Sequence, residues 1–182
     1  MRERNSAKAN SGSERDLMSD LLIWALENAR WQTLSLVEDL RPEQMCLQTP
    51  AGENHPAWIL GHLLLGDTYL LSMLKARELS ADFVDLLNKY GPASKPNSNI
   101  ENYDSKDFLV ERLTETGVLR LDALQKMKNF DQPTPDETLV RTQPSIGHHL
   151  QILVFHEGHH CGQISAWRKA NGLSAVRGIF AS

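Results

Sequence analysis

The sequence predicts an all-α protein, folded as a four-helix bundle with long connections. Four long segments carry apolar residues at every third or fourth position, which is the spacing of one helical face. No segment alternates apolar and polar residues with a period of two for long enough to form a sheet, and we detect no internal repeat. The connections between the four segments are ten or more residues long, which favours a bundle with a long crossover.

The composition is that of one soluble domain with a sizeable core. Of the 182 residues, 41% are hydrophobic and 23% are charged, and the net charge is −4. This balance gives no electrostatic basis for binding nucleic acid or an anionic membrane. The apolar runs are far shorter than the roughly 20 residues of a membrane span. The polar N-terminus lacks the apolar core of a signal peptide, and Cys46 and Cys161 form no disulfide framework, so we expect a cytoplasmic protein.

The first helix is expected to follow a disordered, polar lead-in over residues 1–13. Ser13 is a candidate cap, and the acidic residues of the first turn suit a helix N-terminus. The helix should end near Leu40, because Pro42 interrupts it. The apolar positions that predict this amphipathic helix are Leu17, Leu21, Trp24, Ala25, Asn28, Trp31, Leu34 and Val37.

The second helix is predicted from Asn54, His55 and Pro56, since proline is favoured in the first turn and either preceding residue can cap. It should run to about Arg77. His62 lies in the middle of its apolar face. Gly66 lies on the same face, where the missing side chain would let another segment or a ligand approach closely.

Two loops divide the rest of the chain. A short helix is expected within residues 80–87, followed by a loop over residues 91–103 that is rich in Pro, Asn and Ser. A loop of this length is often a lid or a wall of a binding site. Ser105 should cap the third helix, which ends near Asn129, and residues 131–144 form the second loop.

The fourth helix is expected over residues 145–170, with Asn171 and Gly172 as a left-handed stop. Residues 173–182 should form a short irregular tail. The predicted bundle therefore occupies residues 14–172.

Two histidines of the fourth helix share a face with its apolar stripe. His156 and His160 are four residues apart, so their side chains lie one turn apart and can bind one ion. His62 is the other histidine at the centre of a helical apolar face. Together the three predict a site for a divalent transition metal, with positions left for water or substrate as in catalytic sites. Zinc, nickel and ferrous iron all suit imidazole ligands.

Two other interpretations fit the same residues. A lone inward histidine is more often a hydrogen-bonded core residue than a ligand. Glu157 and His160 have the Glu-x-x-His spacing of di-iron bundles. A di-iron site needs a second such motif, and Glu27, Glu38 and Glu111 do not form one, so the three-histidine site is favoured.

The stretch from His156 to Ile164, which reads HEGHHCGQI, resembles the H-E-x-H-H-x-G-Q-I signature of the DinB-like (DNA-damage-inducible, YfiT-like) metalloprotein superfamily. Residues 58–63 resemble the second-helix motif of that family, and residues 144–147 resemble the entry to its last helix. The resemblance covers residues 15–172. It implies an up-down-down-up bundle, often a homodimer, with one divalent metal held by His62, His156 and His160.

Five further residues are expected to line the pocket or to support the ligands: His149, His159, Gln163, Trp58 and Tyr69. His149 lies two turns before His156 and points inward, as a pocket residue or a fourth ligand. His159 lies at the edge of the metal face, and Gln163 suits a supporting hydrogen bond to a ligand. Cys161 lies off this face, so we expect a bystander thiol.

The resemblance implies a thiol transferase, which attaches a low-molecular-weight thiol to an electrophile or isomerises a thiol adduct. A metal with an open position would bind a thiol and deprotonate it at neutral pH. The sequence identifies no separate catalytic residue. Two alternatives are a metal-dependent hydrolase with a bound water as nucleophile, and a non-catalytic metal- or ligand-binding stress-response protein. We expect a small-molecule substrate and a homodimer, without nucleic-acid or membrane partners.

Overall fold

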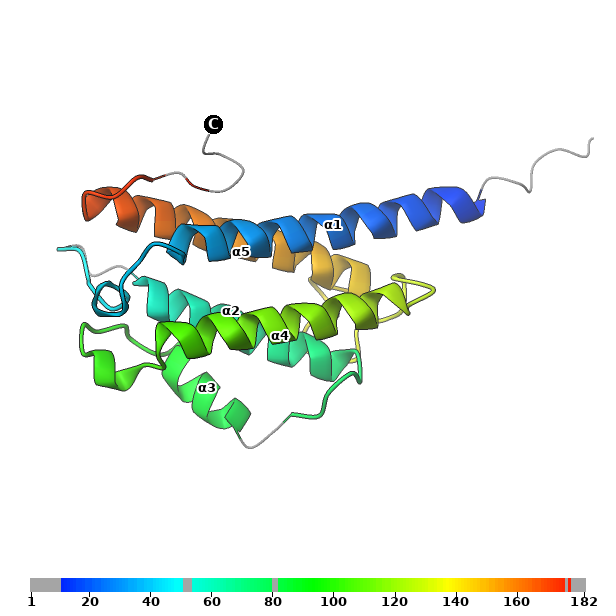
Figure 1. The fold of residues 1–182 in the computed structure, drawn as a ribbon. Helices are drawn as coiled ribbons and strands as arrows, with labels where there is room; N and C mark the ends of the chain where they lie inside the picture. The colour runs from blue at the N-terminus through cyan, green and yellow to red at the C-terminus, as the bar shows by residue number, and fades with distance from the viewer. Residues whose placement is uncertain (1–10, 51–53, 80–81, 176, 178–182) are drawn as a thin grey trace, which may run out of the picture.

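The computed structural model describes residues 11–50, 54–79, 82–175 and 177 (Figure 1). These residues form five α-helices and two short 3-10 helices without a strand, so the predicted all-α class is confirmed. None of the helices within this part of the chain is both long and apolar enough to cross a bilayer. The α-helices are α1 (Ser11–Val37), α2 (Pro56–Met73), α3 (Asp82–Tyr90), α4 (Lys106–Gln125) and α5 (Ile146–Ala170).

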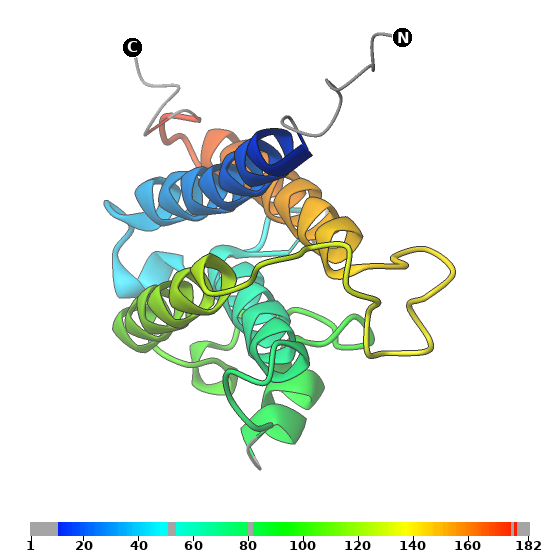
Figure 2. The same cartoon turned by 90° about the vertical axis from the view of Figure 1, so that its right-hand side faces the viewer.

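The four long helices pack side by side. α1 packs on α5 and α4, and α2 packs on α4, α5 and the short helix α3. α1 and α5 run in one direction along the molecule, and α2 and α4 run in the other (Figure 1). The view along the helices shows α1 and α5 above α2 and α4, with α3 outside the four (Figure 2).

The predicted starts of α2, α4 and α5 are confirmed by their caps, whereas Ser13, the predicted cap of α1, lies inside that helix. The His55 ring accepts a hydrogen bond from the Trp58 amide at the start of α2. Ser105 and Ser145 cap α4 and α5 in the same way, each through its hydroxyl oxygen. At the end of α5, Gly172 adopts a left-handed φ of 72°, as a helix stop requires.

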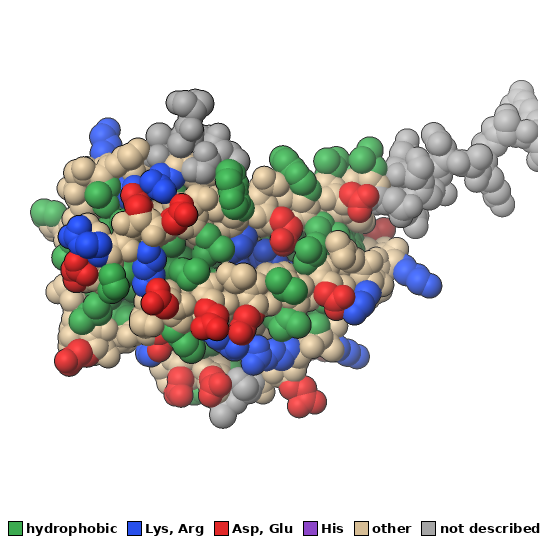
Figure 3. All heavy atoms as spheres, in the orientation of Figure 1, with side chains coloured by type: hydrophobic (Ala, Val, Ile, Leu, Met, Phe, Trp, Pro, Cys, Tyr) green, Lys and Arg blue, Asp and Glu red, His purple; other side chains and the backbone are tan. Residues whose placement is uncertain are grey.

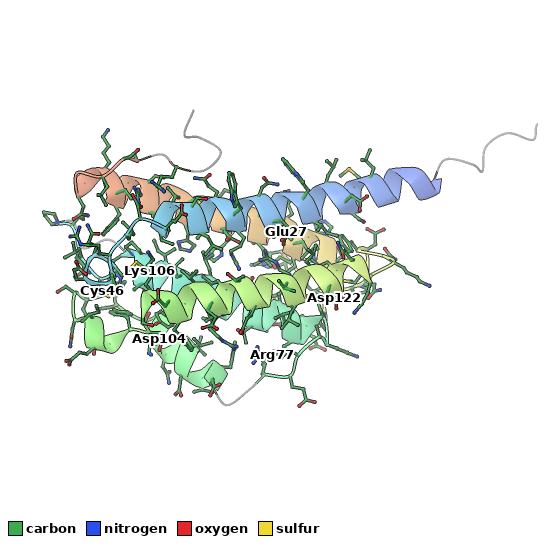
Figure 4. The ribbon with its side chains drawn as sticks, in the orientation of Figure 1. Glu27, Cys46, Arg77, Asp104, Lys106 and Asp122 are labelled. Atoms are coloured by element: carbon green, nitrogen blue, oxygen red, sulfur yellow. The ribbon has the colours of Figure 1, made fainter. Side chains whose placement is uncertain are left out.

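Several helix ends differ from the prediction. α1 begins at Ser11, so residues 11–13 of the predicted lead-in are helical, and residues 1–10 lie outside the described part. It ends at Val37, and the Lys106 ammonium donates to the carbonyls of Glu38 and Leu40 beyond that end (Figure 4). α2 ends at Met73, four residues early, where Lys75 turns into a left-handed φ of 55°.

The face predicted for α1 is wrong over most of its length. Leu17 is 58% exposed, Trp24 65% and Trp31 49%, so these side chains point to solvent. The core side of α1 holds Leu26, Arg30, Thr33 and Leu36 instead, and of the predicted positions Val37 is buried with them. α1 therefore carries apolar residues on two opposite sides. The buried side is the harder one to recognise in the sequence, because Arg30 and Thr33 interrupt its apolar pattern.

The core is built around α2, most of whose residues are buried. One cluster lies around Trp58, Leu60 and Trp167, and a second lies around Leu26, Leu70 and Leu150. Asp67 of α2 contacts Arg30 and Arg120, and Gly61 packs against the Tyr90 ring, so specific contacts orient this helix. In this orientation His62 faces His156 of α5.

Candidate metal centre

Three imidazole nitrogens converge between α2 and α5. His62 Nε2 and His160 Nε2 each lie 3.1 Å from His156 Nε2. All three ligand atoms lie within 4.8 Å of one another. Among the described residues, this is the one group of three or more histidine, cysteine or acidic side chains whose ligand atoms meet in this way. The structure thus brings together the three histidines that the sequence singled out.

Hydrogen bonds at the opposite ring nitrogens orient two of these rings. His62 Nδ1 donates to the backbone carbonyl of Tyr90 at 2.8 Å, and His160 Nδ1 donates to Gln163 Oε1 at 2.8 Å. With the proton on Nδ1, the Nε2 atom of each ring presents a lone pair. Fixing the tautomer through the second nitrogen is the usual arrangement around metal-binding histidines. The donor set therefore fits a divalent cation at the point where the Nε2 atoms meet.

The electrostatics also favour neutral rings. Burial lowers the pKa of His156 to about 4, with repulsion from His62 as a smaller cause. Burial and the neighbouring His156 lower the pKa of His160 to about 3. The pKa of His62 is lowered by burial as well. All three imidazoles are therefore unprotonated at neutral pH, which is the form that binds metals.

Trp58 forms one wall of the centre. Its ring stacks on His62 with centroids 4.7 Å apart and planes within 10°, and it meets the His160 ring edge-on at 6.3 Å. Trp58 Nε1 donates to Ser94 Oγ at 2.7 Å, and this hydroxyl donates to the Gly91 carbonyl. The loop predicted to form a wall of the site is thus connected to it through Trp58.

Gly61 allows the Tyr90 ring to approach α2. A Cβ atom at Gly61 would lie 2.3 Å from that ring, whereas a Cβ atom at Gly66 would meet no heavy atom within 4 Å. The close approach expected at Gly66 therefore occurs at Gly61. It places the Tyr90 carbonyl beside His62, and sequence reasoning missed this anchor because any residue supplies a backbone carbonyl.

The expected supporting residues fall into two groups. Gln163 holds the His160 ring and also donates to His159 Nε2 at 3.1 Å, and His159 itself is exposed. His149 and Tyr69 lie two turns away, about 10 Å along their helices. The carboxylate of Asp136 accepts from the Tyr69 hydroxyl, and Gln143 Oε1 accepts from His149. His149 is not part of the group of converging nitrogens.

Cys161 faces α1 instead of the metal centre. Its sulfur lies 3.1 Å from Thr33 Oγ1, and burial raises the pKa of the thiol to about 11. A protonated, half-buried thiol is a weak nucleophile and a weak ligand.

A buried ion network that the sequence reading missed lies beside the centre. Each long helix supplies one member: Arg30 from α1, Asp67 from α2, Arg120 from α4 and Glu157 from α5. The Arg30 guanidinium contacts Glu157 at 2.7 Å and Asp67 at 2.8 Å, and Arg120 contacts Asp67 at 2.8 Å. Helical phase could not identify Arg30, because the apolar face predicted for α1 is its exposed side and Arg30 lies on the other.

The network is electrically balanced, with two cations and two anions. Burial alone would raise the pKa of Asp67, but Arg30 and Arg120 hold it below its usual value. Glu27, labelled on α1 in Figure 4, adds a weaker contact of 3.4 Å to Arg120 at the edge of the network. Both carboxylate oxygens of Glu157 accept hydrogen bonds from Arg30. The geometry therefore does not support the di-iron interpretation of Glu157 and His160.

A family model described as the DinB superfamily matches residues 25–164. This span begins within α1, reaches into α5 and contains all three converging histidines. A comparison with curated proteins finds no match to this chain.

Proposed function

Since this chain belongs to the DinB superfamily, we propose that it is a divalent-metal-binding protein whose ligands are His62, His156 and His160. The observation that carries this proposal is the convergence of three Nε2 atoms, two of them with their tautomer set by bonds at Nδ1. Without a cation, His156 Nε2 lies 3.1 Å from two unprotonated nitrogens, His62 Nε2 and His160 Nε2. A neutral His156 ring can donate a hydrogen bond to only one of them. Zinc, nickel and ferrous iron all suit this donor set.

The proposal includes the arrangement of the helices as an up-down-down-up four-helix bundle. The opposite directions of the α1–α5 and α2–α4 pairs support this arrangement (Figure 1). A cytoplasmic location belongs to the same proposal, and the free thiols of Cys46 and Cys161 are compatible with it.

We propose that the reaction is the transfer of a low-molecular-weight thiol to a small electrophile. A bound divalent metal supplies a Lewis acid that lowers the pKa of a thiol at its open positions. The chain contributes three neutral ligands, so the full charge of the cation is available to the thiol. Trp58 supplies an apolar wall beside His62 and His160, on which an apolar part of the substrate would pack.

The first experiment tests the metal site. Purified protein should contain about one equivalent of transition metal by elemental analysis, and dialysed protein should rebind it in a calorimetric titration. The His156→Ala, His160→Ala double variant should lose this binding. A matched control is His148→Ala, which removes an exposed imidazole of the same helix outside the group of converging nitrogens. If the double variant retains the full metal content, the proposed metal site is refuted.

A second experiment tests the reaction on the metal-loaded protein. Electrophiles are offered with and without a panel of small thiols, and adducts are detected by mass spectrometry. A transferase is silent until a thiol is supplied, whereas a hydrolase converts esters or amides without one. Inertness toward both panels, with the metal site loaded, would favour a ligand-binding protein.

A further inference from the structure

A second polar group lies between α2 and α5, about 10 Å from the metal centre along the helices. Its members are Tyr69 of α2, His149 of α5, and Asp136 and Gln143 of the loop over residues 131–144. The Asp136 carboxylate accepts from the Tyr69 hydroxyl, and Gln143 Oε1 accepts from His149 Nδ1. The Tyr69 and His149 rings have centroids 6.3 Å apart, so both helices and the loop meet here. We call these four residues the distal group.

One atom of the distal group lacks a partner. His149 is 6% exposed, and its Nε2 atom is buried without a hydrogen bond to any of the described residues. Burial lowers the pKa of His149, and the Asp136 carboxylate opposes this shift without reversing it, so the ring is neutral. Because Nδ1 donates to Gln143, the neutral ring carries a lone pair on Nε2 and no proton there. Burying an unpaired acceptor costs stability, so a hydrogen-bond donor from a ligand would be favoured at this atom.

The charges around His149 favour a donor that is also a cation. Burial and the Asp136 carboxylate raise the pKa of Tyr69 to about 12, so its hydroxyl stays protonated and Asp136 stays an acceptor. The loop over residues 131–144 carries three acidic residues and one basic residue, namely Asp131, Asp136, Glu137 and Arg141. The face over α1 and α4 instead mixes acidic and basic side chains (Figure 3). A primary ammonium group has three donors and no acceptor, which suits two acceptors in an acidic setting.

The surface of α2 is open between the distal group and the metal centre. Gly66 lies one turn after His62 and one turn before Tyr69, on the same side of the helix. A Cβ atom at Gly66 would meet no heavy atom of the described residues within 4 Å. A ligand that binds at both ends therefore has room to pass over Gly66.

The loop over residues 131–144 covers His149 and is fastened at its base. The Thr134 amide donates to the Pro144 carbonyl at 3.2 Å, which pairs the two ends of the loop. Between these ends the loop, in yellow in Figure 2, extends outward beside α5. The contact of this outer part with α2 is the side-chain hydrogen bond between Asp136 and Tyr69. Opening that bond would expose His149 Nε2 without breaking the pairing at the base.

We propose that the distal group binds the primary ammonium group of the thiol substrate while the thiol sulfur binds the metal, an inference that rests on the proposed thiol transfer. The substrate class is therefore an aminothiol, with a chain of about six carbons between sulfur and nitrogen to match the two helical turns. The ammonium group would donate to His149 Nε2 and to the Asp136 carboxylate. Attachment at two points would fix the position of the sulfur on the metal.

The test is calorimetric titration of the zinc-loaded full chain with three six-carbon thiols that end in an ammonium, a hydroxyl or a carboxylate group. The ammonium thiol should bind about 10- to 100-fold more tightly than the hydroxyl thiol, because its hydrogen bonds are charge-assisted, and the carboxylate thiol should bind most weakly. The two-carbon pair, 2-aminoethanethiol and 2-mercaptoethanol, is too short to reach both ends and should bind without this preference.

One substitution and its control locate the preference. Asp136→Asn keeps an acceptor for the Tyr69 hydroxyl but removes the charge, and it should reduce the preference for the ammonium thiol to less than about threefold. The matched control is Glu137→Gln, which removes the charge of the exposed neighbouring residue and should keep the wild-type preference.

The outcomes separate this proposal from the proposed function. Equal binding of the three six-carbon thiols, or an Asp136→Asn variant with the wild-type preference, would overturn the ammonium site and leave the metal site standing. If no thiol binds the zinc-loaded protein, the thiol chemistry fails, and titration of the metal-free protein with hexylamine tests the distal group by itself. Hexylamine binding that Asp136→Asn weakens about tenfold would support the ammonium site, and absence of such binding would overturn it.

Discussion

Removing the Glu157 carboxylate is the most direct test of the buried ion network. Its oxygens lie 2.7 and 3.3 Å from Arg30 Nε and Nη2, and the residue is 2% exposed. In Glu157→Ala, Arg30 and Arg120 share Asp67 as their one fully buried counter-charge. Breaking a buried pair by removing one partner costs about 3–5 kcal/mol, because the other charge remains desolvated.

This loss is a large fraction of the about 5–15 kcal/mol that stabilises a domain. For a chain of this length it should lower the melting temperature by about 6–20 °C. Urea unfolding of the metal-free protein, followed by circular dichroism, measures it. The matched control is Glu115→Ala, since Glu115 also lies 2.7 Å from an arginine, Arg112, but is 50% exposed. Its loss should stay below about 1 kcal/mol.

Similar losses of stability in Glu157→Ala and Glu115→Ala would show that burial does not strengthen the Glu157 contact.

A double variant identifies the cause of the loss. In Glu157→Leu with Arg30→Met, no charge is left without its partner, because Asp67 still contacts Arg120 at 2.8 Å. Replacing a buried pair with apolar residues of similar volume is often neutral. This variant should therefore recover most of the stability that Glu157→Ala loses.

Three further predictions concern the metal centre. Gly61→Ala should lower the free energy of unfolding by about 1–3 kcal/mol and weaken metal binding, because the new methyl group collides with the Tyr90 ring. Its control is Gly66→Ala, which has open space around the new methyl group. This variant should raise the free energy of unfolding by up to about 1 kcal/mol in the same urea assay. Gln163→Ala should lower metal affinity about 10- to 100-fold in a chelator competition, and unchanged affinity would exclude a role in holding the His160 ring. Because burial holds the pKa of His156 at about 4, the unfolded chain binds the extra proton, and the stability of the metal-free protein should fall as pH drops from about 6.5 toward 4. His156→Leu should make that pH dependence less steep without abolishing it, because the pKa values of His62 and His160 are also lowered, and an unchanged profile would contradict it.

Local signals in the sequence predicted the starts of α2, α4 and α5 and the three histidines that converge. Ser105 and Ser145 cap helices in the structure because capping depends on a few neighbouring residues. His62, His156 and His160 were found because each lies on an inner helical face, and helical phase is also a local property.

Tertiary contacts explain what the sequence did not reveal. The periodicity of α1 was real, but it marked the exposed side, because periodicity does not say which neighbour an apolar face meets. Helical periodicity does not say which charged partner a buried residue meets, and the fold places Arg30 Nε 2.7 Å from Glu157 Oε1. The anchoring of His62 depends on a carbonyl 28 residues away, which no local pattern encodes.

The two halves of the metal centre are 94 residues apart in the chain. Closing a loop of that length costs about 4 kcal/mol of chain entropy. A cation can therefore bind all three histidines only in states in which α2 and α5 are already in contact. Binding should therefore slow unfolding more than it accelerates folding, unless α2 and α5 already touch in the transition state. Refolding rates measured with and without metal would show whether the contact between α2 and α5 forms before or after the transition state for folding.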